Sequence, residues 1–397
     1  MEAISNKILG IEVKDLEACN GINTAKEIIN QPDAWKEAVS NLYQNKENIN
    51  IFLKKFLQKE KYRIILTGAG TSAFAGETCE PYLTKVLGEK VEAIATTDLV
   101  ACPENYFIKG IPTLLVSFAR SGNSPESVHA VKLANELVDD LYQLVITCNE
   151  NGKLALNTKE DKKSLLLLMP AQTNDLGFAM TSSFTTMVLS CIGSFNINNI
   201  DSFIEDTDKL ANSVELFIQS NTKKITELAN EDFKRIIYLG SSTSKGIARE
   251  SALKVLELTA GIVNASYDTP LGFRHGPKSV IDDESITIIY ISNNKYTRLY
   301  DIDLAKEMLS HRKKDKVILV GCNIEHELKE YADYTFDLEN IEYSLDNEAL
   351  LPLQQIIFGQ ILSFLKSDIL GITPDNPCPT GEVNRVVQGV ILHDLIK

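Results

Sequence analysis

The sequence predicts an α/β protein built from two tandem copies of one module. Three short, apolar, β-branched segments recur at one offset of 172 residues, which chance similarity does not explain. The pairs are Arg63–Ser72 with Arg235–Ser244, Thr113–Phe118 with Ser285–Tyr290, and Val145–Cys148 with Val317–Val320. Such segments are typical of buried parallel strands. Helical patterns such as Ser124–Leu137 and Leu304–His311 lie between them, so each module is expected to be a flavodoxin-like parallel sheet flanked by helices.

The chain is expected to divide into four segments. These are an N-terminal helical segment at residues 1–44, module 1 at 45–200, module 2 at 201–370 and a C-terminal tail at 371–397. Thr24-Ala-Lys-Glu27 fits a capping box at a helix start. Residues 200–232 have the pattern of a helical linker, and the tail is rich in Pro, Asn and Gly and is expected to begin as a loop.

Charge and composition argue against several classes of protein. The chain has 397 residues and a net charge of −14, whereas a nucleic-acid partner requires basic patches. No apolar stretch of about 18 residues is present and the N-terminus lacks a signal-peptide pattern, so no membrane partner is expected. The seven cysteines include no CxxC pair, which indicates reduced thiols in a cytoplasmic protein. No cysteine has a context that supports catalysis.

The first strand of module 1 is followed by a turn that suits a phosphate group. Gly70, Thr71 and Ser72 lead into a helix expected from Ala73. Such a turn exposes backbone N–H groups, hydroxyls and the positive end of the helix dipole. The spacing is neither a dinucleotide fingerprint nor a Walker A loop. The alternative is a tight βα turn that binds no ligand.

The second strand of module 1 is followed by a comparable loop. Arg120 supplies a guanidinium, and Ser121 and Ser124 precede a helix that starts with proline. The alternative for Ser124 is a simple N-cap. A third loop, Asp175–Phe184, contains Ser183 and either closes the site or caps the next helix. Two such helix starts side by side in one sheet indicate a phosphate site more specifically than either loop alone.

Module 2 keeps one of these loops and loses the other. Gly240–Ser244 follows its first strand, but Ser292–Tyr296 after its second strand lacks the Ser-Gly-x-Ser pattern. We therefore expect the phosphate in module 1.

Module 2 carries candidate acid–base groups instead. Glu250, Lys254 and Glu257 share one helical face at i, i+4 and i+7, and their neighbours are apolar, so the helix should be mostly buried. Carboxylates in such a place tend to have a raised pKa and to act in proton transfer. The alternative is a solvated, salt-bridged face. His275 lies in a loop and suits acid–base work beside a carboxylate. No Cys/His cluster indicates a metal site.

These residues together resemble the sugar isomerase (SIS) family over about residues 45–377. Gly70-Thr71-Ser72, Ser121-Gly122-x-Ser124, the helix ending at Glu257 and His275-Gly-Pro277 are similar to the isomerase half of glucosamine-6-phosphate synthase. The whole chain resembles more closely the galactosamine-6-phosphate deaminase/isomerase branch, also called tagatose-6-phosphate ketose/aldose isomerase. That narrower match rests on Thr24–Pro32, Thr269–Pro277 and Val383–Gly389.

The resemblance implies a role for each candidate residue. Thr71, Ser72, Ser121 and Ser124 would hold the phosphate of the substrate. Glu257 would move a proton between C1 and C2, with Lys254 nearby. His275 would help to open the sugar ring and would come from the partner subunit. The resemblance therefore implies a homodimer, or a higher homo-oligomer, with each site completed across the interface.

Two positions depart from the synthase pattern. The synthase has a catalytic lysine in its tail, where this chain offers Arg385, which we assign to binding because a guanidinium forms no Schiff base. Ala119 and Arg120 replace a Ser-Gln pair, which changes the phosphate contacts expected there.

The implied reaction converts galactosamine 6-phosphate to tagatose 6-phosphate and ammonia by proton transfer between C1 and C2. No cofactor is needed, because the substrate imine stabilises the carbanion. The alternatives are a plain aldose/ketose 6-phosphate isomerase, a fructosamine-phosphate deglycase and a non-catalytic sugar-phosphate sensor. The sequence leaves the configuration of the sugar, galacto or gluco, open.

Overall fold

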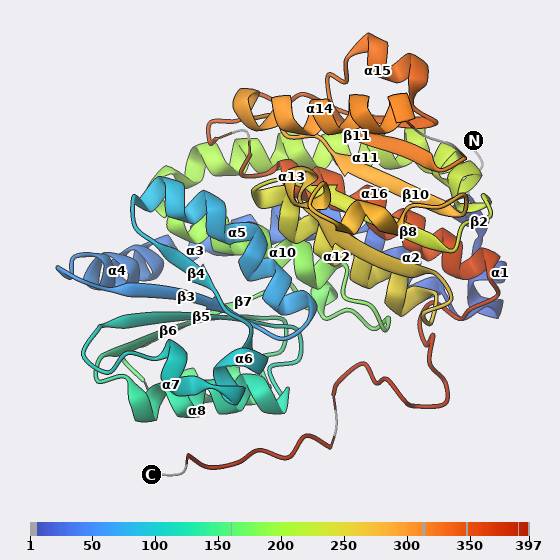
Figure 1. The fold of residues 1–397 in the computed structure, drawn as a ribbon. Helices are drawn as coiled ribbons and strands as arrows, with labels where there is room; N and C mark the ends of the chain where they lie inside the picture. Colours follow the sequence, from blue (N-terminus) through green and yellow to red (C-terminus); the bar gives the residue numbers. More distant parts are fainter. Residues whose placement is uncertain (1–5, 160, 312–313, 347, 388, 396–397) are drawn as a thin grey trace, which may run out of the picture. The chain divides into compact units, whose positions relative to one another are not determined.

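The computed structural model of the chain describes residues 6–159, 161–311, 314–346, 348–387 and 389–395 (Figure 1). The chain divides into two compact units. The module 1 unit comprises Ala34–Asp175, Ser182–Ile204 and Thr380–Lys397, and the module 2 unit comprises Met1–Asp33, Leu176–Thr181 and Glu205–Pro379. Each unit contains one five-stranded parallel sheet with helices around it, so the predicted fold class is confirmed.

The module 1 unit is built around a sheet with the strand order β4-β3-β5-β6-β7. Numbered within the module, this is the 2-1-3-4-5 order of flavodoxin-like sheets. Strands β5 and β6 are buried along their whole length, as expected at the centre of a parallel sheet. The elements are α3 (Gln31–Gln44), α4 (Lys46–Leu57), β3 (Arg63–Thr67), α5 (Thr71–Leu87), β4 (Val91–Ala93), α6 (Thr96–Ala101), α7 (Pro103–Tyr106), β5 (Thr113–Ala119), α8 (Pro125–Leu137), β6 (Leu141–Thr147), α9 (Lys153–Thr158), β7 (Ser164–Leu168) and α10 (Ser182–Phe195).

Helices cover both faces of the module 1 sheet. On one face, Ile65, Leu115 and Val145 pack in a single apolar cluster with residues of α6, α8 and α9. On the other face, α5 and α10 contact each other and the strands β3 and β6 (Figure 1). The loops at the carboxyl ends of the strands lead into these helices, and ligands of doubly wound sheets bind at such loops.

The module 2 unit repeats this architecture with the strand order β9-β8-β10-β11-β12. One face of the sheet packs against α13, α14 and α15. Helix α12 contacts the strands β8 and β9 and also the helix α16 (Figure 1). The elements are β1 (Lys7–Ile8), β2 (Ile11–Glu12), α1 (Val13–Ala18), α2 (Ile22–Ile29), α11 (Ile200–Ala229), β8 (Arg235–Gly240), α12 (Thr243–Leu258), β9 (Asn264–Asp268), α13 (Pro270–Phe273), β10 (Ser285–Tyr290), α14 (Lys295–His311), β11 (Lys316–Cys322), α15 (His326–Tyr331), β12 (Tyr334–Leu338) and α16 (Leu351–Ile369).

The internal repeat can be checked in the strand register. The first two predicted strands pair in the same register in both modules, so the 172-residue offset holds for them. In module 1 Ser117 pairs with Val145, whereas in module 2 its counterpart Ile289 pairs with Leu319. The expected match of Val145 with Val317 is therefore wrong by two residues. A shift of two leaves the same side chains facing the core, so the apolar pattern of the strand looks unchanged.

The N-terminal segment is not helical throughout, contrary to expectation. Lys7–Ile8 and Ile11–Glu12 form a short antiparallel hairpin before α1. The capping box predicted at Thr24 is also wrong, because α2 begins at Ile22 and Thr24 lies inside its first turn.

The first turn of α2 is capped from the far end of the chain instead. The carboxylate of Asp375 accepts the backbone N–H groups of Asn23 and Thr24 at 3.0 and 2.8 Å. It also accepts the Asn23 amide at 2.9 Å and the Thr24 hydroxyl at 2.6 Å. Glu27 is used elsewhere, since its carboxylate accepts the N–H of Gly177 at 3.0 Å. Capping by Asp375 depends on a contact across more than three hundred residues, which no local pattern reveals.

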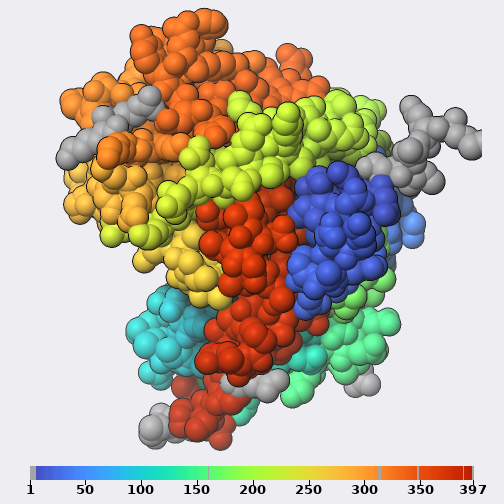
Figure 2. Space-filling view, turned by 90° about the vertical axis from the view of Figure 1, so that its right-hand side faces the viewer, coloured from blue at the N-terminus to red at the C-terminus, as the bar shows by residue number. Residues whose placement is uncertain are grey.

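Helix α11 and the tail agree with the sequence-based expectations. Residues 200–229 form one helix of 30 residues, and the described residues after Gly371 form no helix or strand. Within the module 2 unit, Figure 2 shows α11 (lime) and the N-terminal residues (blue) beside α16 (red). Gln354 of α16 donates to Ser213 of α11 at 2.8 Å. In the part of the chain that the structure describes, no helix has both the length and the apolar character needed to cross a membrane.

Candidate active site

Glycines shape the turn after β3. A Cβ at Gly68 would lie 2.5 Å from the backbone of Ser72, so no larger residue fits there. Gly70 has φ 57° and ψ −128°, a backbone conformation that favours glycine. Helix α5 starts at Thr71, two residues before the expected start at Ala73. The first turn of this helix therefore lies directly at the carboxyl end of β3, where we expected a phosphate.

The loop after β5 has the expected glycine turn and helix start. Gly122 has φ 64°, and the hydroxyl oxygen of Ser121 accepts the N–H of Asn123 at 3.2 Å. Ser124 stands at the N-cap of α8, but its hydroxyl makes no capping hydrogen bond. Simple capping therefore does not account for Ser124. Arg120 is 7% exposed, so this loop also carries a buried guanidinium.

The two loops lie at neighbouring positions on the same edge of the sheet. Strands β3 and β5 are adjacent and parallel. The chain leaves β3 toward β4 on one side and returns to β5 on the other, which makes this the topological switch point of the sheet. Ligands of doubly wound proteins bind at such a point. The N-termini of α5 and α8 both reach it, and each favours an anion.

Ser183 of the third loop is held by a carboxylate within the module 1 unit. Its N–H and its hydroxyl donate to Oδ2 of Asp175 at 3.0 and 2.5 Å, and the hydroxyl of Ser182 donates to Oδ1. All three residues are buried. Asp175 thus caps the start of α10, in line with the alternative that this loop caps the next helix.

The C-terminal tail brings Arg385 to the same loops. The Arg120 guanidinium donates to the backbone carbonyl of Arg385 at 2.9 Å. The Arg385 guanidinium donates to the carbonyl oxygen of Asp175 and, at 3.4 Å, to that of Asn174. Arg120, Arg385 and the third loop, which are far apart in the sequence, therefore form one contact group in the module 1 unit.

Helix α12 of module 2 carries a lysine between two carboxylates. Nζ of Lys254 lies 3.3 Å from Oε1 of Glu250 and donates to Oε2 of Glu257. The side chains of Lys254 and Glu250 are fully buried, whereas that of Glu257 is 23% exposed. Burial lowers the pKa of Lys254, but the charges of Glu250 and Glu257 outweigh burial and raise that pKa above its usual value. The face is a buried ion-pair network with Glu257 at its accessible end, and not a solvated surface.

His275 lies exposed on the loop after α13. The structure records no hydrogen bond from its ring to Glu257 among the described residues. Its neighbours fix the loop instead, because Arg274 and Lys278 both pair with Glu307 of α14, at 2.9 and 2.5 Å. The two cations hold the backbone on either side of His275 and leave the imidazole accessible.

Two of the cysteines are poor candidates for an alternative nucleophile. All seven are free thiols. Burial raises the pKa of Cys148 to about 12 and that of Cys19 to about 11. Thiols with such pKa values are protonated near neutral pH and react slowly.

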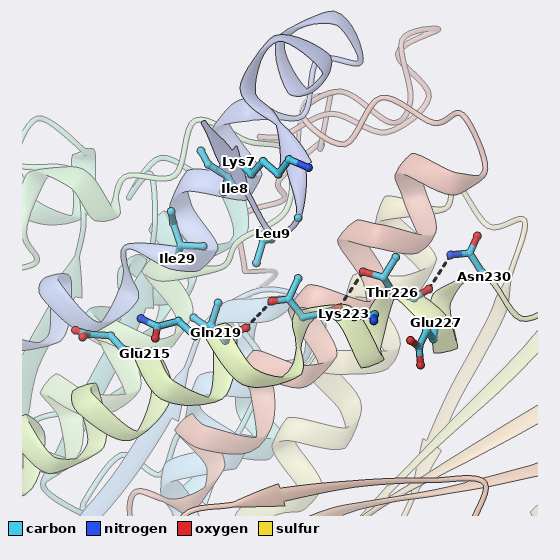
Figure 3. Close-up of a pocket in the computed structure, with 13 residues that line it drawn as sticks. Lys7, Ile8, Leu9, Ile29, Glu215, Gln219, Lys223, Thr226, Glu227 and Asn230 are labelled. Atoms are coloured by element: carbon cyan, nitrogen blue, oxygen red, sulfur yellow. Dashed lines mark hydrogen bonds between the residues drawn. The ribbon is translucent and has the colours of Figure 1, made fainter. Parts of the chain in front are cut away.

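A groove in the module 2 unit lies away from the predicted site residues (Figure 3). It has a volume of about 820 Å³ and lies between the β1–β2 hairpin, α2 and α11. Its hydroxyls are used within α11: Thr222 donates to the Ile218 carbonyl at 2.5 Å, and Thr226 to the Thr222 carbonyl at 2.9 Å. None of the predicted site residues lines this groove.

Two carboxylates that hold elements of the site were not predicted from the sequence. Asp175 organises the start of α10, and Glu307 holds the loop of His275. Both are single carboxylates on elements other than the ones that they support. A lone carboxylate has no distinctive sequence pattern, so only the tertiary contacts identify them.

Three features define the class of this protein: the doubly wound sheets, the paired helix N-termini of module 1 and the ion-pair network of module 2. They are those of α/β proteins suited to small phosphorylated ligands. The model of the SIS domain family matches residues 56–192 and 228–348, one match in each module. The chain belongs to the SIS domain family.

Relatives place the chain within one branch of this family. A protein of Escherichia coli named D-galactosamine-6-phosphate deaminase AgaS is 44% identical over 377 residues, which are 95% of this chain and 97% of that protein. The crystal structure of tagatose-6-phosphate ketose/aldose isomerase from Escherichia coli has a TM-score of 0.86 and 41% identity and covers 95% of this chain and 98% of its own. A crystal structure from Clostridium novyi NT has a TM-score of 0.95 and 47% identity, with 98% and 99% covered. The resemblance found in the sequence is confirmed.

Proposed function

We propose that this chain is a deaminating isomerase that converts galactosamine 6-phosphate to tagatose 6-phosphate and ammonia. The single observation that carries the proposal is the carboxylate of Glu257, held in place by the buried Lys254 at the end of α12. The choice of reaction and sugar is supported by the names of the similar proteins and by their similarity over almost the whole chain.

Module 1 would hold the substrate phosphate. We assign this role to Gly70, Thr71, Ser72, Ser121 and Ser124, which belong to the two loops at the switch point. Arg120 and Arg385 would add positive charge near an anion in a protein of net charge −14. We place Ser183 in a supporting role, because its hydroxyl donates a hydrogen bond to Asp175. Binding energy from the remote phosphate would position C1 and C2 for reaction.

Glu257 would act as the base and acid of the chemical step. It takes the C2 proton of the open-chain amino aldehyde, which gives an enolamine, and returns a proton to C1. The product is a ketimine at C2. Water adds to this carbon and ammonia leaves, which yields the ketose phosphate. Lys254 would fix the orientation of Glu257 by its hydrogen bond to Oε2, so that Oε1 is left to meet the substrate.

The direct test is incubation of the pure protein with galactosamine 6-phosphate. Release of equimolar ammonia and tagatose 6-phosphate is expected. The plain isomerase is the second candidate, because a related structure bears that name, and it would interconvert tagatose 6-phosphate and its aldose without ammonia. A panel that includes glucosamine 6-phosphate and the N-acetylated sugars would fix the configuration of the substrate. Lack of ammonia from every amino sugar would reject the deaminase.

Replacement of Glu257 by Gln tests the catalytic assignment. The amide keeps the shape of the side chain but cannot take a proton, so turnover should fall by at least about a hundredfold while substrate binding stays. The measurement is kcat together with Kd from calorimetry. Glu227→Gln, on the surface of α11, is the matched control and should keep full activity. A fully active Glu257→Gln protein would remove Glu257 from the mechanism.

We also propose a homodimer in which His275 serves the site of the partner subunit, where it would open the sugar ring. The exposed ring of His275, on a loop clamped by Glu307, supports this role. Co-expression of differently tagged Glu257→Gln and His275→Ala chains tests it. If sites are shared, one site of each mixed dimer has both wild-type residues, so activity returns. If each chain has its own complete site, the mixed dimers stay inactive.

A further inference from the structure

The second module keeps the backbone of the first phosphate turn. A Cβ at Gly240 would lie 2.3 Å from the carbonyl oxygen of Ser244, which is the same close approach as in module 1. Ser242 has φ 53° and ψ −124°, nearly the values of Gly70, although it is not glycine. Such a strained conformation persists only where the surroundings enforce it. The anion cradle of module 2 is therefore still built, even though its second loop has lost the Ser-Gly-x-Ser pattern.

A carboxylate of the chain lies in this cradle. Oε1 of Glu348 accepts the backbone N–H groups of Asn293 and Asn294 at 2.7 and 2.9 Å, and Oε2 accepts the hydroxyl of Ser292 at 2.9 Å. The backbone carbonyl of Glu348 accepts the hydroxyl of Thr243 at 3.2 Å. Glu348 is 8% exposed. At the switch point between β8 and β10, its carboxylate thus binds the loop after β10, and its backbone binds the start of α12 after β8. Glu348 comes from the loop before α16, which corresponds to the third loop of module 1.

Three further donors of the cradle are also used internally. Asp301 accepts the N–H of Ser292 at 2.9 Å and the hydroxyl of Ser241 at 2.7 Å. The hydroxyl of Ser244 donates to the side chain of Gln355 at 2.6 Å. Two carboxylates thus accept hydrogen bonds from the loops that follow β8 and β10. The side-chain oxygens of Glu348 stand where oxygens of a bound phosphate would be expected, because they accept the same kinds of N–H and O–H groups that bind phosphate.

We propose that the carboxylate of Glu348 is a built-in substitute for phosphate, which closes the anion site of module 2 and leaves one phosphosugar site per chain. The inference that the anion site of module 2 is closed rests on the hydrogen bonds of Glu348 and does not depend on the proposed function. The count of one site per chain rests in addition on the proposed function of module 1. The retained cradle and its internal carboxylate explain why a duplicated protein loses one ligand site without losing the fold of that module.

Phosphate binding to a set of variants tests the proposal, with inorganic phosphate as the probe in calorimetry. Wild type should bind one phosphate per chain. Ser72→Ala/Ser121→Ala, which damages the module 1 loops, should bind none. Addition of Glu348→Ala to that double variant opens the second cradle and should restore one phosphate per chain. Glu348→Gln keeps the cradle filled and should restore none, and Glu327→Ala removes one negative charge from α15 without opening the cradle.

A second readout covers the case in which Glu348→Ala folds poorly. Phosphate should raise its unfolding midpoint in a saturable manner and more than it raises that of wild type, because a ligand of the folded state stabilises that state. Chloride at equal ionic strength should not do so. Binding of phosphate by module 2 in the Ser72→Ala/Ser121→Ala protein with Glu348 intact would overturn the proposal, and so would a Glu348→Ala protein that gains neither binding nor stability from phosphate. A wild type that binds none would reject the module 1 site and leave the test of Glu348 intact.

Discussion

At the scale of single residues, two buried carboxylates of module 2 have raised pKa values. Burial raises the pKa of Asp301 from its usual 3.8 to about 6, with a further contribution from the charge of Glu348, while Arg298 and two hydrogen bonds act in the opposite direction. Burial also raises the pKa of Glu348. Both groups therefore bind protons more tightly in the folded than in the unfolded chain.

The first prediction concerns Asp301→Asn. Because its folded pKa is raised, Asp301 favours folding at low pH, and this contribution is lost as pH rises from about 4 to about 6. The free energy of unfolding of wild type should therefore fall across this interval more steeply than that of the variant, by up to about 1.4 kcal/mol per pH unit. Urea unfolding at several pH values measures both slopes. Parallel curves would show that Asp301 does not titrate as described.

Sequence periodicity predicted that Glu250, Lys254 and Glu257 share one helical face, but it could not predict how deeply each side chain is buried. The helical repeat places all three on one side of α12 whatever lies next to it. The depth of each side chain depends on α16, which packs on α12 from about a hundred residues further along the chain. Glu250 is fully buried as a result and Glu257 is 23% exposed, which separates the two carboxylates by role.

At the scale of elements, the turn after β8 stores backbone strain. Ser242 has a positive φ of 53°, and a non-glycine residue in such a conformation costs about 1–3 kcal/mol. Ser242→Gly should remove this cost, offset by roughly 0.5–1 kcal/mol of chain entropy, and so stabilise the protein by about 1 kcal/mol. Denaturant unfolding is the measurement. Ser242→Ala keeps the Cβ and should bring no gain, and equal stability of the Gly and Ala variants would argue against strain.

The start of α2 gives a second prediction at this scale. The carboxylate of Asp375 accepts four hydrogen bonds from Asn23 and Thr24. Asp375→Ala should therefore lower the free energy of unfolding by about 1–2 kcal/mol, as for the loss of a helix cap. Asp375→Asn keeps one acceptor oxygen and should cost less. Asp303→Ala is a control that removes an exposed carboxylate of α14, away from α2. A loss no larger than in this control would show that α2 does not depend on the tail.

The boundaries of elements were predicted less well than their existence. The helix after β3 begins two residues earlier than expected because Gly70 supplies the positive φ that ends the turn. The N-terminal hairpin was missed, since its two strands have only two residues each and no alternating pattern can be seen at that length. The capping box failed because Thr24 and Glu27 have tertiary partners that compete with the local pairing.

At the scale of the whole molecule, the net charge of −14 opposes an anionic substrate. Salt shortens the Debye length from about 30 Å at 0.01 M to about 10 Å at 0.1 M and so screens this repulsion. If the proposed reaction holds, kcat/KM for the sugar phosphate should rise over this interval, on the order of twofold, while kcat stays constant. Steady-state kinetics in sodium and potassium chloride give the measurement. A steep fall of kcat/KM with salt would show that the local positive field of the site dominates instead.

The internal repeat predicted the architecture of both sheets, because buried parallel strands leave a strong apolar pattern. The two-residue shift of β11 could not be seen, since a shift of two preserves the faces of a strand. The role of Glu348 was also hidden. The loss of the Ser-Gly-x-Ser pattern indicated that the second site had changed, but only the fold brings the loop before α16 onto the other two loops.

The membership of the two units has a consequence for synthesis on the ribosome. Residues up to Asp33 belong to the module 2 unit, and residues from Thr380 belong to the module 1 unit. In the latter, Asp394 pairs with Lys132 at 2.6 Å and the carbonyl of His393 lies 3.0 Å from the ring of His129. The segment up to Asp33 can therefore pack in its unit only after residues 205–379 have been made. Module 1 gains the contacts of residues from Thr380 only after module 2 has been made. Neither unit can therefore be completed by one continuous stretch of the chain.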